Sequence, residues 1–334
     1  MEMKKRSEIL DISKGIGILL VVWAHAKAPF SRFIYQFHMP FFFLVSGYLY
    51  NKDCSLKSYI CKKTKTLYLP FIACNILGGG IKWAFGFYHY TFKTFIEYVL
   101  NVLLTLTKDG QFFGATWFLG ALYIVAIVYK CLDYFIADGK YKSIFLCGLF
   151  TASACIGFSI NFPYMQSRTM ILGMFYAVGV YVKDNKEEFV KFDKPVMALF
   201  SFLLFIAGAH YNNANMGANE YTYRLVFVIG ALCAGYCMIH VSGYLVKTKY
   251  IKKLLILFSK YSIDIVIWQF VVFRIAIVIQ LYIHDLPINT VLDYYPVYDT
   301  RHGWWILYVV IGMFVSMFIG WFLRETIYKI KRRN

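Results

Sequence analysis

Long apolar runs recur through the whole sequence, and they are the feature that most limits how this chain can fold. Hydrophobic residues make up 60% of its 334 residues and charged residues 16%, whereas soluble domains carry about 25% charged residues. Runs of about 18 or more apolar residues are long enough to cross a bilayer as helices. The pattern therefore predicts an all-α, polytopic integral membrane protein.

The runs predict about ten transmembrane helices in a single integral membrane domain that covers residues 1–334. One further apolar stretch, 92–107, carries Lys93, Glu97 and Asn101 at helical spacing, and we expect it to form an interfacial helix on the outer face. The ten predicted spans are residues 12–28, 35–50, 66–86, 113–130, 143–160, 169–182, 195–211, 221–246, 260–283 and 304–323.

The distribution of positive charge predicts how these spans are oriented. If the N-terminus is cytoplasmic, the inner segments hold 25 of the 35 Lys and Arg residues and the outer loops hold eight. Because Lys and Arg collect in cytoplasmic loops, we expect both termini in the cytoplasm. Orientation also accounts for most of the formal charge of +17, so we expect no binding of nucleic acid. We expect the protein to lie in the cell (plasma or inner) membrane, in contact with membrane lipid.

The cysteines give no sign of a metal site. No two of the eight cysteines form a CxxC motif, and no histidine lies at the spacing of a zinc finger. We therefore expect neither a bound metal nor a disulfide framework.

The first two predicted spans contain ionisable residues that are costly to place in a membrane. Lys14 and His25 are eleven residues apart, which puts them on one face of a helix and separates them by a rise of about 16 Å. Asp11 lies about 40° from the same line, and His38 lies at a depth similar to that of His25 in the next span. Intramembrane ionisable residues often mark function, so these four residues are the candidate catalytic residues.

The residue types leave two functions open. Histidine takes up and releases protons near neutral pH, which suits a general base in catalysis. The same polar stripe also suits a membrane carrier or flippase that moves a sugar, a lipid-linked glycan or a proton. Spacing alone does not decide between them.

Further charged residues are candidates for binding roles. Arg274 lies in the ninth span and must face a polar partner, whereas Arg168 and Arg224 begin the sixth and eighth spans, where they bind substrate or simply anchor the interface. The cytoplasmic cluster Lys62, Lys63 and Lys65 either reflects membrane orientation or binds an anionic, phosphorylated donor. The outer loop 284–303, rich in Tyr and Asp, is either a solvated loop or a surface for a sugar-like partner.

Two adjacent motifs resemble the membrane acyltransferase 3 family. They are "LDISKGIGILLVVWAH", which ends at His25, and "FIYQFHMPFFFLVSGYLY", which contains His38. The similarity continues in order through "KKTKTLYLPFI" and "LFSKYSIDIVIWQF". The resemblance implies a bacterial membrane O-acyltransferase with about ten helices and cytoplasmic termini, which moves an acyl group, usually acetyl, from cytoplasmic acetyl-CoA to a hydroxyl of an extracytoplasmic glycan or lipid-linked sugar.

The resemblance also implies roles for individual residues. The family's essential histidine corresponds to His25 and its basic partner to Lys14. The cytoplasmic basic pair that would bind coenzyme A corresponds to Lys62 and Lys65, with Lys63 between them. On this reading His25 deprotonates the acceptor hydroxyl, and an oxyanion is stabilised by one of the residues His38, Arg224, Arg274 or Arg168. Many family members carry His where this chain has Gln269, which makes a catalytic role at that position doubtful.

Overall fold

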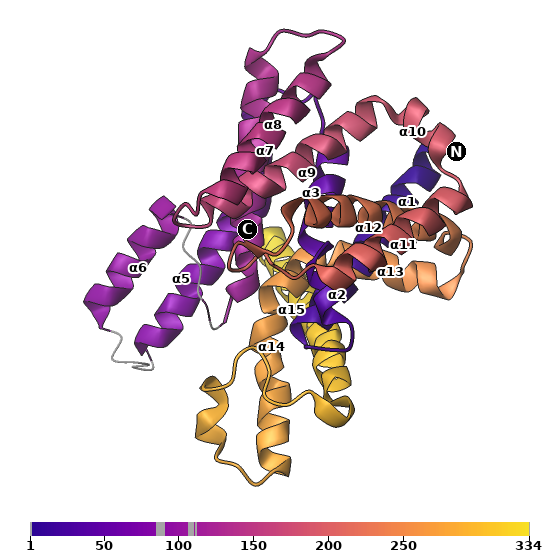
Figure 1. Cartoon of the computed structure of the whole chain (residues 1–334). Helices are drawn as coiled ribbons and strands as arrows, with labels where there is room; N and C mark the ends of the chain where they lie inside the picture. Colours follow the sequence, from indigo (N-terminus) through magenta and orange to yellow (C-terminus); the bar gives the residue numbers. More distant parts are fainter. Residues whose placement is uncertain (1, 85–90, 106–109, 111, 334) are drawn as a thin grey trace.

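The computed structural model describes residues 2–84, 91–105, 110 and 112–333, and it is predominantly helical (Figure 1). In chain order the elements are α1 (Glu2–His25), α2 (Ser31–Tyr35), α3 (His38–Tyr48), α4 (Leu56–Lys63), the π-helix η1 (Thr64–Tyr68), α5 (Leu69–Ala84), α6 (Phe92–Thr105), η3 (Gly114–Thr116), α7 (Trp117–Phe135), α8 (Lys142–Ser159), α9 (Gln166–Asp184), α10 (Lys186–Phe192), α11 (Pro195–Tyr211), β1 (Ala214–Asn215), β2 (Glu220–Tyr221), α12 (Arg224–Leu245), α13 (Tyr250–Lys260), α14 (Ser262–Ile283), η4 (Ile288–Leu292), η5 (Arg301–Gly303) and α15 (Trp304–Arg333).

Every predicted span contains a helix, but the described residues do not confirm a count of ten. Five helical segments are long and apolar enough to cross a membrane, and the number rises to six if α10 and α11, which meet at 86°, form one broken span. The five segments are Gly114–Phe135, Lys142–Ser159, Arg224–Leu245, Ser262–Ile283 and Arg301–Ile330. The fold is therefore an all-α membrane fold, and the ten-span topology with cytoplasmic termini stays a prediction.

The predicted span 35–50 is broken in the structure. The helical path from Ser31 ends at Tyr35, and α3 begins at His38. Pro40 explains the break, because it has no N–H to donate to the carbonyl of residue 36 and is tolerated only in the first turn of a helix. The 11 residues of α3 rise about 16 Å, which is half of the ~30 Å hydrocarbon core.

Helix α1 is the centre of the bundle. It packs against α3, α12, α13, α14 and α15, while Asp11, Lys14 and His25 stay partly exposed. Helices α5 and α6 lie side by side at one edge of the molecule (Figure 1). The prediction of a separate helix at 92–107 is confirmed by α6, although its interfacial position stays a prediction.

Small residues allow α3 and α9 to approach closely. A Cβ atom added to Gly179 would lie 2.0 Å from the carbonyl oxygen of Leu44, and one added to Gly47 would lie 1.9 Å from that of Tyr176. Such contacts are typical of membrane helices, whose association depends on close packing. The two glycines hold α3, and with it His38, against the rest of the protein.

We therefore expect Gly179→Ala to destabilise the protein by about 1–3 kcal/mol, because the new methyl group must displace backbone. Gly148→Ala in α8 is the matched control. Nothing lies within 4 Å of the Cβ added there, so the change should be neutral or slightly stabilising. Thermal unfolding in detergent compares the two variants, and equal Tm values would contradict this account of the α3–α9 contact.

Candidate active site

His25 is the last residue of α1, and its ring is fixed by a residue far along the chain. The helix ends here because Lys27 adopts a left-handed backbone conformation with φ of 49°. Nδ1 of His25 lies 3.0 Å from Oε1 of Gln269 in α14. The ring also packs on Phe270, with centroids 4.8 Å apart. Two adjacent residues of α14 therefore orient the predicted catalytic histidine.

The second hydrogen bond of Gln269 determines which nitrogen of His25 carries the proton. Nε2 of Gln269 donates to the carbonyl oxygen of Val266 at 3.2 Å. A carbonyl only accepts, so the amide must present its oxygen to His25, and Nδ1 of His25 must donate. The lone pair of the neutral imidazole then lies on Nε2. Gln269 is fully buried, which keeps this arrangement away from water.

His38 lies beside His25, as the sequence predicted. The ring centroids are 6.3 Å apart and the planes are almost perpendicular, at 89°. Nδ1 of His38 donates to the carbonyl of Ile34 at 2.9 Å, so a neutral His38 also carries its lone pair on Nε2. As a neutral ring it can accept a hydrogen bond there but cannot donate one to an oxyanion.

Tyr35 completes the cluster and was not predicted. Its ring lies 5.4 Å from that of His38 and 6.2 Å from that of His25. Its hydroxyl donates to the carbonyl of Ala24 at 3.0 Å, which ties α2 to the end of α1. Nothing in the sequence pattern singles out Tyr35 among the 28 tyrosines. The cluster of His25, His38, Tyr35, Gln269 and Phe270 is called the histidine site below.

The charged residues at the other end of the polar stripe form an ion pair. Nζ of Lys14 lies 2.7 Å from Oδ1 of Asp11, and both side chains are partly exposed. Asp11 also accepts a hydrogen bond from Ser259 at 3.3 Å. Because α1 is continuous from Glu2 to His25, Lys14 and His25 are separated by about 16 Å along it. The structure thus keeps these two predicted residues apart from the histidines.

Two of the three predicted donor-binding lysines share one pocket. Lys62 and Lys65 are exposed and line a shallow pocket of about 570 Å³, together with Lys57. Lys63 turns away, since its ammonium group lies 5.4 Å from the ring centre of Tyr59. Burial, followed by the positive charge of Lys62, lowers the pKa of Lys63. Lys57 belongs to the pocket but was not predicted, because it lies a full turn before the cluster.

The three predicted arginines occupy separate places. Arg274 donates to the carbonyls of Val291, at 2.7 Å, and Tyr294. It thereby ties the outer loop 284–303 to α14. Arg168 donates to the carbonyl of Gly217 at 2.6 Å and lies over a tryptophan ring.

Arg224 lines a pocket on the β1–β2 hairpin. No described contact joins Arg168 or Arg224 to a histidine, so their predicted role at an oxyanion stays a prediction.

The outer loop reaches the histidine site through two aromatic contacts. The ring of Tyr295 packs on Phe270 at 5.2 Å, and Phe270 packs on His25. The guanidinium carbon of Arg274 lies 6.0 Å from the ring centre of Tyr295. The loop is therefore a packed cover beside the site rather than a freely solvated segment.

Comparison with known proteins agrees with this arrangement of helices and histidines. A family model described as an acyltransferase domain, acyltransferase 3, matches residues 8–325. The chain belongs to the acyltransferase 3 family. Membership confirms the resemblance and places the protein among the membrane acyltransferases.

The chain is also similar to the nodulation protein NolL of Mesorhizobium japonicum, with 26% identity over 144 residues. This match covers 37% of the chain and 35% of the relative. No solved structure matches the chain significantly.

Proposed function

We propose that this acyltransferase moves an acetyl group from cytoplasmic acetyl-CoA to a hydroxyl of an extracytoplasmic or lipid-linked surface polysaccharide, with His25 as general base. The observation that carries the proposal is the pair of hydrogen bonds made by Gln269. They hold the proton of a neutral His25 on Nδ1 and so leave its lone pair on Nε2, in a partly buried setting that suits a general base. The family match favours this acyl-transfer role over that of a carrier.

The chemistry balances with groups present in the chain and its two substrates. Nε2 of His25 takes the proton of the acceptor hydroxyl while that oxygen attacks the thioester carbonyl. The new ester C–O bond forms and the C–S bond breaks. The thiolate of coenzyme A leaves and recovers the proton from His25. We assign His38 to binding a neighbouring hydroxyl of the acceptor sugar, because its neutral ring accepts a hydrogen bond at Nε2 and the one proton of the reacting hydroxyl goes to His25.

The proposal places the donor and acceptor on opposite sides of the cell membrane. Lys57, Lys62 and Lys65 would bind the phosphates of coenzyme A from the cytoplasm. The acyl-pantetheine arm would extend along α1, over the ~16 Å that separates Lys14 from His25. Lys14 then lies along the path of the donor, with Asp11 holding its side chain in place.

The test uses purified protein in vesicles with labelled acetyl-CoA on one side and bacterial surface polysaccharide on the other. We expect label to appear on the polysaccharide as an alkali-labile ester. Movement of a sugar across the bilayer without transfer of label would favour the carrier instead.

The lysine pocket gives a separate prediction. We expect the double variant Lys62→Ala, Lys65→Ala to raise the KM for acetyl-CoA about tenfold or more, because each charge-assisted hydrogen bond to a phosphate contributes about 1.5–3 kcal/mol. The kcat should change little, since the pocket does not touch the reacting atoms. Lys186→Ala is the matched control, because Lys186 is an exposed lysine in α10. An unchanged KM in the double variant would remove the donor from this pocket.

A further inference from the structure

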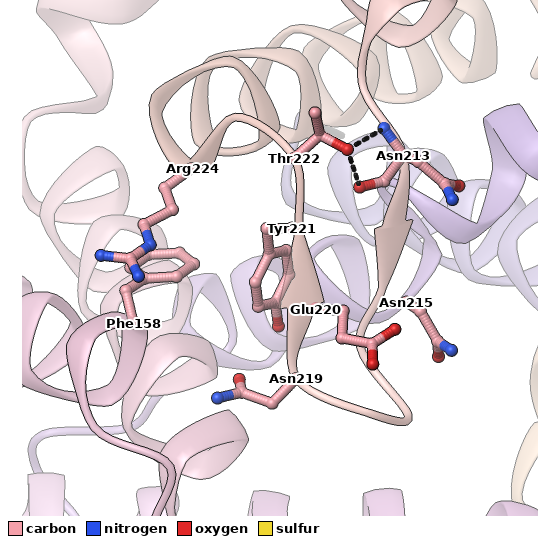
Figure 2. A pocket seen from close by; sticks show the side chains of 8 residues that line it. All are labelled: Phe158, Asn213, Asn215, Asn219, Glu220, Tyr221, Thr222 and Arg224. Atoms are coloured by element: carbon pink, nitrogen blue, oxygen red, sulfur yellow. Dashed lines mark hydrogen bonds between the residues drawn. The ribbon is translucent and has the colours of Figure 1, made fainter.

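A second pocket lies outside the histidine site, on the hairpin that joins α11 to α12. Figure 2 shows its lining, which comes from the hairpin, from the start of α12 and from Phe158 at the end of α8. Its volume is about 440 Å³, which falls within the range of small-molecule sites, about 300–1,000 Å³. Arg224 is the one lining residue that the sequence analysis singled out, and the histidine chemistry makes no use of the pocket.

The hairpin is held at its base by the segment that carries His38. Nε2 of Gln36 donates to the carbonyls of Ala209 and Asn212, at 3.0 and 3.2 Å. The amide of Asn212 in turn donates to Oε1 of Gln36 at 3.0 Å. Gln36 and Asn212 are both buried. Because Gln36 lies two residues before His38, these bonds connect the pocket to the histidine site through a short, buried stretch of chain.

The tip of the hairpin is fixed as well. Arg168 donates to the carbonyl of Gly217, and Nδ2 of Asn219 donates to the carbonyl of Gly157 at 3.3 Å. Thr222 bonds the backbone of Asn213 across the two strands, as Figure 2 shows. A pocket held at both ends is preorganised, which reduces the entropic cost of binding.

Two buried polar atoms on the pocket wall have no hydrogen-bond partner within the described part of the chain. They are Oδ1 of Asn219 and the hydroxyl of Tyr221. Figure 2 shows the hydroxyl of Tyr221 pointing toward Asn219 on the same side of the hairpin. Buried polar groups are nearly always paired, so these two lining residues keep an unused acceptor and an unused donor, which a polar ligand in the pocket reaches once their side chains turn toward it.

The remaining lining has the composition of a carbohydrate site. The ring of Phe158 packs edge-on against Tyr221, with centroids 5.1 Å apart, which gives the pocket an apolar wall. Asn213 and Asn215 add amides, and Glu220 and Arg224 add one charge of each sign. Amides and a carboxylate bind vicinal hydroxyls, while aromatic rings cover the apolar face of a sugar ring.

We propose that the hairpin pocket binds a pyranose residue of the acceptor glycan, next to the residue that receives the acyl group. This inference rests on the proposed function, because it assigns the pocket to the acceptor of that reaction. Glu220 argues against an isolated phosphate as the ligand, since a carboxylate repels it. The polar lining likewise argues against a lipid chain.

The test measures sugar binding directly, by saturation-transfer NMR on the whole protein in nanodiscs. The probes are the methyl pyranosides of glucose, rhamnose and N-acetylglucosamine, with inorganic pyrophosphate as the anionic alternative. We expect at least one pyranoside to bind. Glu220→Gln should weaken that binding about tenfold, because it replaces a charge-assisted hydrogen bond to a sugar hydroxyl by a neutral one. Tyr221→Phe should weaken it about three- to tenfold, because it removes one hydrogen bond.

Two features keep the test independent of folding. Tyr221→Phe removes a hydroxyl that has no partner in the described structure, so the Tm should not fall. Asn161→Ala changes an exposed asparagine of the neighbouring outer loop and should leave binding unchanged. The proposal is overturned if no pyranoside binds, if pyrophosphate binds in place of the sugars, or if both pocket variants bind as well as the unchanged protein.

The same measurement separates this inference from the proposed function. It is repeated on His25→Ala, which should bind the pyranoside normally but fail to transfer acetyl. Sugar binding without acetyl transfer by the unchanged protein would leave the pocket in place and contradict only the reaction. A free oligosaccharide and its polyprenyl-linked form, compared as competitors, then identify which of the two supplies the pyranose.

Discussion

His25→Ala should lower the rate of acetyl transfer about 10²–10⁴-fold, which is the usual contribution of a positioned general base. The imidazole is the group whose Nε2 would take the proton of the acceptor hydroxyl, and alanine leaves nothing in its place. The KM for acetyl-CoA should stay nearly unchanged, because the lysines that would bind the donor lie on α4 and η1, in a pocket that does not include His25. The measurement is labelled acetyl on polysaccharide after a fixed time, over a range of acetyl-CoA concentrations.

His210→Ala is the matched control for this prediction. His210 is an exposed histidine at the end of α11, and its ring makes no contact with the histidine site. Both variants are first compared by thermal unfolding, so that a loss of fold is not taken for a loss of chemistry. Normal acetylation by a folded His25→Ala protein would remove His25 from the reaction.

Much of the fold was predictable because the helices are encoded locally. Apolar runs bounded by polar residues gave the position of α11 to the residue, and that of α14 to within two residues of its start. The close approach of His25 and His38 also followed from local features, because a short connection joins the end of α1, at His25, to the start of α3, at His38. These predictions needed no knowledge of distant contacts.

The features that the sequence did not reveal depend on long-range contacts or on one special residue. The bond between His25 and Gln269 joins positions 244 residues apart, and no periodicity predicts such a pairing. The break before α3 follows from Pro40. The long apolar run around Pro40 predicts one continuous span, and this prediction missed the break. The β1–β2 hairpin has strands of only two residues each, too short for an alternating pattern to show.

The count of spans shows a different limit of sequence reasoning. Hydropathy counts apolar residues, but helix length decides whether a segment crosses the bilayer. Among the predicted spans, α3 has 11 residues, which give a rise of about 16 Å. Asp11 and Lys14 in α1 are tolerated because they form an ion pair and stay partly exposed, which hydropathy alone does not register.

Gln269→Leu should lower kcat about 10–100-fold, which is the usual cost of losing a group that orients a functional histidine. Leucine fills a similar volume but cannot accept the Nδ1–H of His25. The imidazole then loses the bond that fixes its tautomer and ring orientation. A larger share of molecules carry the proton on Nε2, and these cannot act as the base because Nε2 must be unprotonated to accept a proton. Gln269 touches no substrate in this account and is a positioning residue.

Gln269→His distinguishes positioning from simple packing. A histidine at this position retains a ring nitrogen that can accept the Nδ1–H of His25. We expect it to recover most of the activity lost in Gln269→Leu, with the KM for acetyl-CoA unchanged in both. Two alternatives would show that Gln269 acts only through packing: full activity in the leucine variant, or equal losses of activity and of Tm in the two variants. The Tm of each protein is measured beside its kcat to separate these cases. Loss of the hydrogen bond to His25 should lower kcat strongly but change the Tm little, because many other contacts hold α14 in place.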